Sequence, residues 1–132
     1  MSLKPTLIIG EDDMGPPSVI EQIKRTGISI NIIEENHTAE GIVNKIECVG
    51  KIINKETKTS LLIDELIKPS IKKLNEISKN SILNNIRVMF ILTMDSGTPV
   101  VAGRKTSANG FIKMIGATNA FEDFEGWKPV GT

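Results

Sequence analysis

The sequence predicts an α/β fold, in which parts of two Rossmann-like parallel sheets are joined by a long bridging helix. Apolar runs at residues 5–10 and 28–33 enclose a helical pattern, and a strand, helix and strand unit of this kind is almost always parallel and right-handed. The run from Val88 to Leu92 is apolar without alternation, which is typical of a strand covered on both faces. Apolar residues at helical spacing fill the interval between these parts. We therefore expect one sheet-containing part at 1–56, a long connecting helix at 57–82 and a second sheet-containing part at 83–132.

Local signals mark the ends of the expected helices. Pro17 suits a first helical turn, and Gly27 suits a helix end. Thr38 is a suitable N-cap for a second helix whose apolar residues recur at three- and four-residue steps. Pro69 lies inside the long helix expected over about 59–79 and removes one backbone hydrogen bond, so we expect a kink there and not a break. A further helix follows Thr106, and the tail after residue 118 shows no regular period.

The composition excludes several classes of function. Sixteen basic and sixteen acidic side chains cancel over 132 residues, so neither nucleic acid nor an anionic membrane is expected as the main partner. Cys48 is the single cysteine and lies within a helical pattern, where a buried structural role is expected. No apolar run reaches the length of a membrane-spanning helix, and no charged leader precedes an apolar core. If the natural protein is exported, we expect its signal to lie outside this chain.

The most informative segment follows the third apolar run. Residues 95–98 offer a carboxylate, hydroxyls and backbone N–H groups, and Arg104 and Lys105 add two cations just before a helix. Ligand sites in open α/β sheets lie at such strand ends, and these groups suit a polar or anionic ligand. The alternative is a solvated connection with Thr106 as an ordinary helix cap.

Five blocks of sequence carry a resemblance to a known family. They read KPTLIIGE at 4–11, GPPSVIEQIKRTG at 15–27, EGIVNKIECVG at 40–50, AGRKTSANGFIKMIG at 102–116 and NAFEDFEGWKP at 119–129. In the residues of these blocks and in their order, the chain resembles the periplasmic heme-binding proteins of ABC-type uptake systems. These belong to a wider group that also carries cobalamin and iron-siderophores. The similarity runs almost from end to end, and the two C-terminal blocks are the specific part of it.

The resemblance implies a fold and a function. The fold is the class III periplasmic binding protein type, with the ligand in a cleft between two lobes. This chain would then be a middle fragment, with the last part of the first lobe at 1–56, the bridge at 57–82 and the start of the second lobe at 83–132, so that both lobes are incomplete. The implied function is to capture heme, or a related iron chelate, at a periplasmic or cell-surface location and to deliver it to the membrane permease without catalysis. Cobalamin and iron-siderophores stay open as ligands. The family usually keeps an iron-ligating Tyr at the start of the first lobe, and the absence of Tyr here agrees with the loss of that part.

The same resemblance suggests where ligand contacts lie. Arg104 is the cation best suited to a heme propionate, because a guanidinium holds a carboxylate bidentately. An exposed arginine without a partner is the competing interpretation. The other candidates are expected to face the cleft from the second lobe or from the strand end of the first: Met94, Asp95, Ser96, Gly97, Glu11, Asp12 and Met14. The residue that would ligate the iron is left unknown. The alternative for Met94 is an ordinary core methionine. The alternative for the acidic turn at 11–13 is a solvated loop.

Other chemistry finds little support in the residues. His37 is the only histidine, and we expect a capping or surface role for it before iron ligation. Asp12 and Asp13 are adjacent, so their carboxylates point apart, and no third metal ligand follows at suitable spacing. No catalytic triad, phosphate-binding loop or zinc spacing is present. A receiver-like signalling domain would need a second strand ending in a phospho-accepting Asp, and a nitrogenase-like component would need more cysteines than Cys48.

The incomplete second lobe also leads to an expectation about assembly. Its aromatic side chains would leave apolar surface in need of cover: Phe111, Phe121, Phe124 and Trp127. We therefore expect self-association, by exchange of the last segment between chains.

Overall fold

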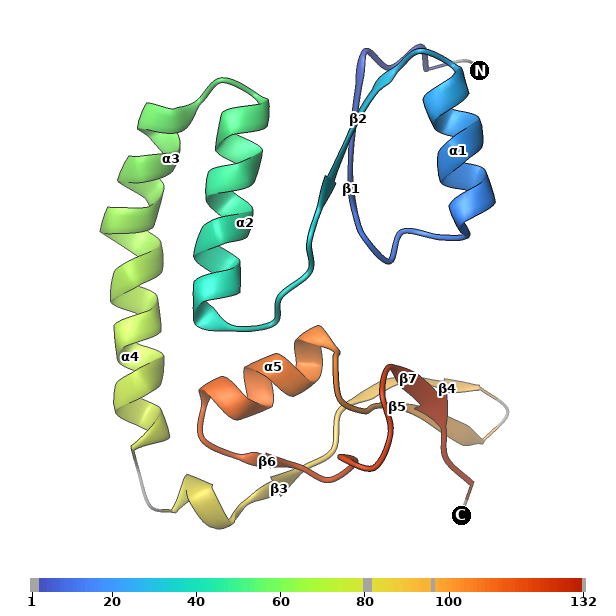
Figure 1. The fold of residues 1–132 in the computed structure, drawn as a ribbon. Helices are drawn as coiled ribbons and strands as arrows, with labels where there is room; N and C mark the ends of the chain where they lie inside the picture. Colours follow the sequence, from blue (N-terminus) through green and yellow to red (C-terminus); the bar gives the residue numbers. More distant parts are fainter. Residues whose placement is uncertain (1–2, 80–81, 96, 132) are drawn as a thin grey trace.

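The computed structural model describes residues 3–79, 82–95 and 97–131, and its first part is the predicted strand, helix and strand unit (Figure 1). Strand β1 (Leu7–Glu11) and strand β2 (Ser29–Ile33) are parallel, with Leu7 opposite Ser29 and Glu11 opposite Ile33. Helix α1 (Pro17–Arg25) connects them. It begins at a proline and is followed by Gly27 with φ +75°, a conformation that glycine adopts without steric cost. The predicted parallel pairing is confirmed.

Helix α2 (Ala39–Ile52) leads from β2 toward the bridge. The Thr38 side chain accepts a hydrogen bond from the Gly41 N–H at 3.0 Å, which confirms the predicted N-cap. Gly50 permits the close approach of the next helix, since a Cβ built there would lie 2.7 Å from the Cβ of Thr59. Helix α2 therefore packs directly against the bridge that follows it.

The bridge is one continuous helical stretch with an irregular middle. It consists of α3 (Glu56–Leu62), the π turn η1 (Ile63–Ile67) and α4 (Lys68–Ser78). The Lys68 N–H donates to the Ile63 carbonyl, five residues back, immediately before Pro69. This π turn absorbs the disturbance from a proline that has no N–H to give. The prediction that the helix continues through Pro69 is confirmed.

The second part of the chain contains six short elements around one helix. They are the 3₁₀ turn η2 (Leu83–Asn85), β3 (Arg87–Val88), β4 (Ile91–Asp95), β5 (Thr98–Ala102), helix α5 (Ser107–Met114), β6 (Thr118–Asn119) and β7 (Trp127–Pro129). Strands β3 and β6 pair in parallel, whereas β4, β5 and β7 form an antiparallel sheet in that order. The Thr106 side chain caps α5 by accepting from the Asn109 N–H at 3.1 Å. The described strands thus form small separate sheets, one before the bridge in the sequence and two after it.

Two predictions about the second lobe are wrong. The run around Val88–Leu92 is not one strand covered on both faces: it changes partner between Val88 and Ile91, and Leu92 is 56% exposed. The physical reason is the turn at Gly97 (φ +83°), which sends β5 back along β4 as a hairpin. The tail also is more regular than expected, because β6 and β7 lie in it and Trp127 contacts Phe90 edge-on at 5.9 Å between ring centroids.

The core lies mainly in the second lobe, where the buried apolar side chains are Val101, Ala102, Ala108, Ile112 and Ala117. In the first part of the chain, Ile33 and Ile63 are buried, while Ile9 and Ile32 are about two fifths exposed. Cys48 is exposed on α2, so the predicted buried role is wrong. The helical pattern placed Cys48 on α2 correctly but did not reveal that this face of α2 is open. No helix in the described ranges combines the length and apolar character needed to cross a membrane.

Candidate functional site

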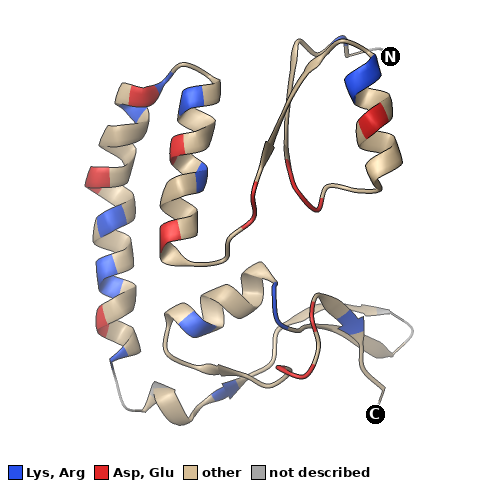
Figure 2. Ribbon diagram, in the orientation of Figure 1, with Lys and Arg blue, Asp and Glu red and all other residues tan. Residues whose placement is uncertain are grey.

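The candidate site lies where the strand ends of the first lobe face the second lobe. The β2–α2 connection crosses above α5, and the acidic ends of β1 and β2 stand opposite the segment that enters α5 (Figures 1 and 2). Two cavities flank this crossing. One of about 200 Å³ is lined from both sides by residues that include Glu35, Lys45 and Met114, and one of about 420 Å³ includes Lys105 and Lys113.

In the first lobe, three predicted residues take part in contacts at the rim. The Lys45 ammonium on α2 donates to a Glu11 carboxylate oxygen at 2.6 Å. The Asp12 carboxylate accepts from the Glu35 N–H at 3.2 Å, so it ties the end of β1 to the segment after β2. Met14 folds back over the strand, since a Cβ built at Gly10 would overlap its sulfur atom. These three predicted residues therefore shape the strand end together.

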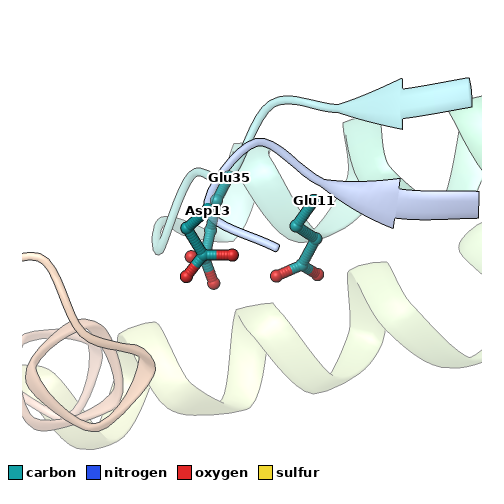
Figure 3. Close-up of side chains that lie close together, drawn as sticks. All are labelled: Glu11, Asp13 and Glu35. Atoms are coloured by element: carbon teal, nitrogen blue, oxygen red, sulfur yellow. The ribbon is translucent and has the colours of Figure 1, made fainter. Parts of the chain in front are cut away.

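Three carboxylates that the sequence did not group meet at this rim. Glu11, Asp13 and Glu35 each offer an oxygen within 4.8 Å of the others (Figure 3). The prediction that no third ligand accompanies the Asp12–Asp13 pair considered only spacing along the chain. The parallel register brings Glu35 beside the end of β1, because Glu11 lies opposite Ile33. Oxygen ligands in such a set suit a hard cation, but Lys45 and His37 already supply positive or polar partners there.

The crowding shifts the pKa values of the rim residues. The pKa of Glu35 is raised, first because burial desolvates its carboxylate and also because Glu11 and Asp13 repel its charge, while His37 and Lys45 act in the opposite direction. The pKa of Lys45 is raised chiefly by its hydrogen bond to Glu11. His37 Nδ1 lies 3.4 Å from a Glu35 oxygen. The only histidine thus belongs to the interlobe rim, where the sequence analysis expected a capping or surface role.

In the second lobe, Arg104 is held in place with donors to spare. Its Nη1 donates to the Glu122 carbonyl at 2.6 Å, and its Nη2 lies 3.8 Å from the Glu125 carboxylate. The side chain is 46% exposed. The Lys105 ammonium takes the other Glu125 oxygen at 3.0 Å, and this hydrogen bond lowers the pKa of Glu125. Because a guanidinium has five N–H donors, Arg104 keeps groups for an incoming carboxylate.

Asn119 positions the segment that carries Arg104, and the sequence analysis did not single it out. Its side chain is fully buried. Its Nδ2 donates to the Ala102 carbonyl at 3.0 Å and to the Asn109 amide oxygen at 3.1 Å, while its Oδ1 accepts from the Phe121 N–H at 3.1 Å. Every polar atom of the amide is thereby used. The signal in the sequence was an asparagine inside an apolar stretch, which has no partner until the chain folds.

Three of the remaining predicted residues lie at the β4–β5 hairpin. Met94 is 62% exposed, Gly97 forms the turn, Asp95 contributes its backbone to β4, and Ser96 lies outside the described residues. Strand β5 separates this turn from Arg104 by five residues, which corresponds to about 16 Å. The structure thus places the hairpin residues and Arg104 at opposite ends of one strand. They do not form one cluster within this chain.

Comparisons with known proteins agree with this arrangement. No protein-family model matches the chain. It is 26% identical over 129 residues to the uncharacterized ABC transporter substrate-binding lipoprotein YvrC of Bacillus subtilis (strain 168), which covers 96% of this chain and 41% of that protein. The periplasmic heme-binding protein RhuT from Roseiflexus sp. RS-1 matches with a TM-score of 0.80 and 25% identity, over 97% of this chain and 49% of RhuT. The periplasmic heme-binding protein HutB of Vibrio cholerae matches with a TM-score of 0.74 and 28% identity, over 96% of this chain and 48% of HutB.

These matches extend over nearly the whole chain, but the chain spans only about half the length of the relatives, or less. The relatives are substrate-binding proteins and not enzymes, which agrees with the absence of a catalytic motif from the sequence. The resemblance that the sequence blocks indicated is confirmed: the chain is similar in sequence and fold to the periplasmic heme-binding proteins of ABC transporters, and it corresponds to about half of such a protein.

Proposed function

We propose that this chain forms part of a substrate-binding protein that captures heme, or a related iron chelate, and delivers it to an ABC transporter permease. The observation that carries the proposal is the match to RhuT over 97% of the chain at 25% identity. Because the matched relatives are described as periplasmic or as a lipoprotein, we further propose a periplasmic or cell-surface location. Binding and release would proceed without a chemical step.

Within this proposal, Arg104 is the ligand-holding cation. Heme presents two propionates beside a flat apolar ring, so a carrier needs a cation and apolar walls. The backbone contact to Glu122 holds the Arg104 side chain, and a charged partner for the guanidinium is already present in Glu125 at 3.8 Å. A propionate would replace or share that long contact at small cost. Charge-assisted hydrogen bonds of this type contribute about 1.5–3 kcal/mol each.

The test is a titration of hemin into the folded 132-residue chain, followed at the Soret band against a protein-free control. We expect a saturable shift with one site. Arg104→Ala should weaken binding about tenfold or more, since the charge-assisted contact is lost. Arg87→Ala is the matched control, because Arg87 also donates to a backbone carbonyl, that of Ala120 at 3.0 Å, in the same lobe.

The outcomes distinguish the role of Arg104 from the identity of the ligand. A saturable shift that Arg104→Ala and Arg87→Ala weaken equally would remove the special role of Arg104 and keep heme as the ligand. No saturable shift from the folded chain would contradict heme binding by this chain, and cobalamin and a ferric siderophore would then be titrated in its place by absorbance.

A further inference from the structure

The two lobes touch at one position where only glycine fits. The segment between β2 and α2 crosses helix α5 at Gly110, and a Cβ built there would lie 2.6 Å from the Cβ of His37 and closer still to the His37 carbonyl oxygen. Carbon atoms in favourable contact are about 3.5–4.0 Å apart. Any side chain at Gly110 must therefore push the first lobe away from α5 by about 1 Å at this contact.

A second close contact lies just beyond the C-terminal end of α5. Gly116 follows the helix with φ +82°, and a Cβ built there would lie 2.6 Å from the Ser78 carbonyl oxygen at the end of α4. Helix α5 is thus attached to the bridge at Gly116 and carries the first lobe at Gly110. Only five residues lie between Gly110 and Gly116, so the first lobe and the bridge contact the same short segment around α5.

The space around the Gly110 contact is open on both sides. His37 lines the cavity of about 200 Å³ with Glu35, Lys45 and Met114, and it also lines the cavity of about 420 Å³ with Lys113. Both hollows open to the molecular surface, so the two lobes are not packed continuously against each other on either side of the His37–Gly110 contact.

We propose that the contact between His37 and Gly110 is the fulcrum about which the two lobes rotate relative to each other. Because glycine has no Cβ, Gly110 sets the distance between the lobes at this contact. The acidic rim at Glu11 belongs to one lobe and Arg104 to the other, so a change at the fulcrum changes the distance between them. Gly110 is in this sense a positioning residue for the cleft. Only the consequence for ligand binding rests on the proposed function.

The fulcrum is tested by a distance measurement without ligand. Spin labels on Cys48, which is exposed on α2, and on a cysteine introduced by Lys128→Cys in β7 report the interlobe distance by pulsed electron spin resonance. Gly110→Ala should shift the mean distance, and Gly110→Val should shift it further in the same direction. Gly131→Ala is the matched control, because nothing lies within 4 Å of a Cβ built there.

An unchanged distance distribution in a folded Gly110→Ala protein would overturn the fulcrum. Circular dichroism checks folding, and alanine should by itself raise helix stability by about 1 kcal/mol, so a shifted distance in a stable protein cannot come from a weakened helix. Hemin titration of the same variants then tests the consequence for the ligand, with affinity expected to fall in the order Gly110→Ala, then Gly110→Val. If the wild-type chain does not bind hemin, the proposed function fails while the distance result still decides the fulcrum.

Discussion

Glu35 shows how a single side chain of the first lobe responds to its surroundings. Its carboxylate is drawn away from water beside Glu11 and Asp13, and its pKa is raised as a result. A carboxyl group whose pKa is higher in the folded than in the unfolded state destabilises the fold when it is charged. Its favourable contribution is present at low pH and is lost as the pH rises through the raised pKa.

Glu35→Gln removes this charge and should stabilise the chain at pH 7. We expect a gain of up to about 1 kcal/mol in the free energy of unfolding, because the ionised wild-type carboxylate carries the cost and the neutral amide does not. The gain should shrink as the pH falls below 4.5, the ordinary pKa of a glutamate carboxyl group, because Glu35 is then protonated in both states. Urea unfolding at pH 7 and pH 4 measures the difference.

Glu21→Gln is the control for this prediction, since Glu21 is exposed on α1 and pairs with Lys24 at 3.0 Å. It should have little effect at either pH. A Glu35→Gln protein that is less stable than wild type at pH 7, or whose stability difference does not depend on pH, would contradict the electrostatic account of the rim.

At the scale of elements, the amide of Asn119 joins three parts of the second lobe. It contacts β5 through Ala102, α5 through Asn109 and the tail through Phe121. The segment between β5 and α5 carries Arg104, and the buried Asn119 amide holds both ends of this segment through Ala102 and Asn109. Buried and fully bonded amides of this type fix the relative position of elements because no other arrangement satisfies them.

Asn119→Asp should break this arrangement. The carboxylate cannot donate to the Ala102 carbonyl or to the Asn109 oxygen, and it brings an unpaired charge into a buried position, so we expect a loss of about 3 kcal/mol or more. Asn85→Asp adds the same charge at an exposed position and serves as the control. Urea unfolding of both variants measures the effect, and equal small losses would show that Asn119 has no special role.

At the scale of the whole molecule, large apolar side chains remain exposed on every part of the chain. Examples with between about two fifths and three fifths of their surface exposed are Ile9, Ile32, Leu61, Leu66, Phe111 and Trp127. Parallel strands such as β1 and β2 are usually covered on both faces. An open apolar surface of this kind favours association with another polypeptide. Of the four aromatic residues expected to form it, Phe111 and Trp127 are exposed, whereas Phe121 and Phe124 are half-buried and pack against each other.

We predict that the 132-residue chain self-associates in a concentration-dependent way. The double substitution Leu66→Lys and Phe111→Lys should reduce association, because each places a charge on an exposed apolar surface of the bridge or of α5. Ser60→Lys, at an exposed position of α3, is the control for added charge. Sedimentation velocity measures the assembly, and a folded monomer over a wide range of concentrations would contradict the prediction.

The sequence by itself determined the α/β class, the order of the elements from β1 to α4, the helix after Thr106, the parallel pairing of β1 with β2, the cap at Thr38, and the family resemblance. These features depend on local spacing, on turn residues and on contiguous motifs, all of which are present in the chain before it folds. The passage of the bridge through Pro69 was predicted for the same reason, although the π turn that permits it was not.

Only the tertiary structure decided the rest. The meeting of Glu11, Asp13 and Glu35, the burial of Asn119 and the contact of His37 with Gly110 join residues that lie far apart in the chain or on different elements. The division of the third apolar run between two sheets and the exposure of Cys48 were likewise invisible. The physical reason is that periodicity fixes which face of an element is apolar, whereas the partner of that face, and the spacing between the lobes, are set by contacts distant in sequence.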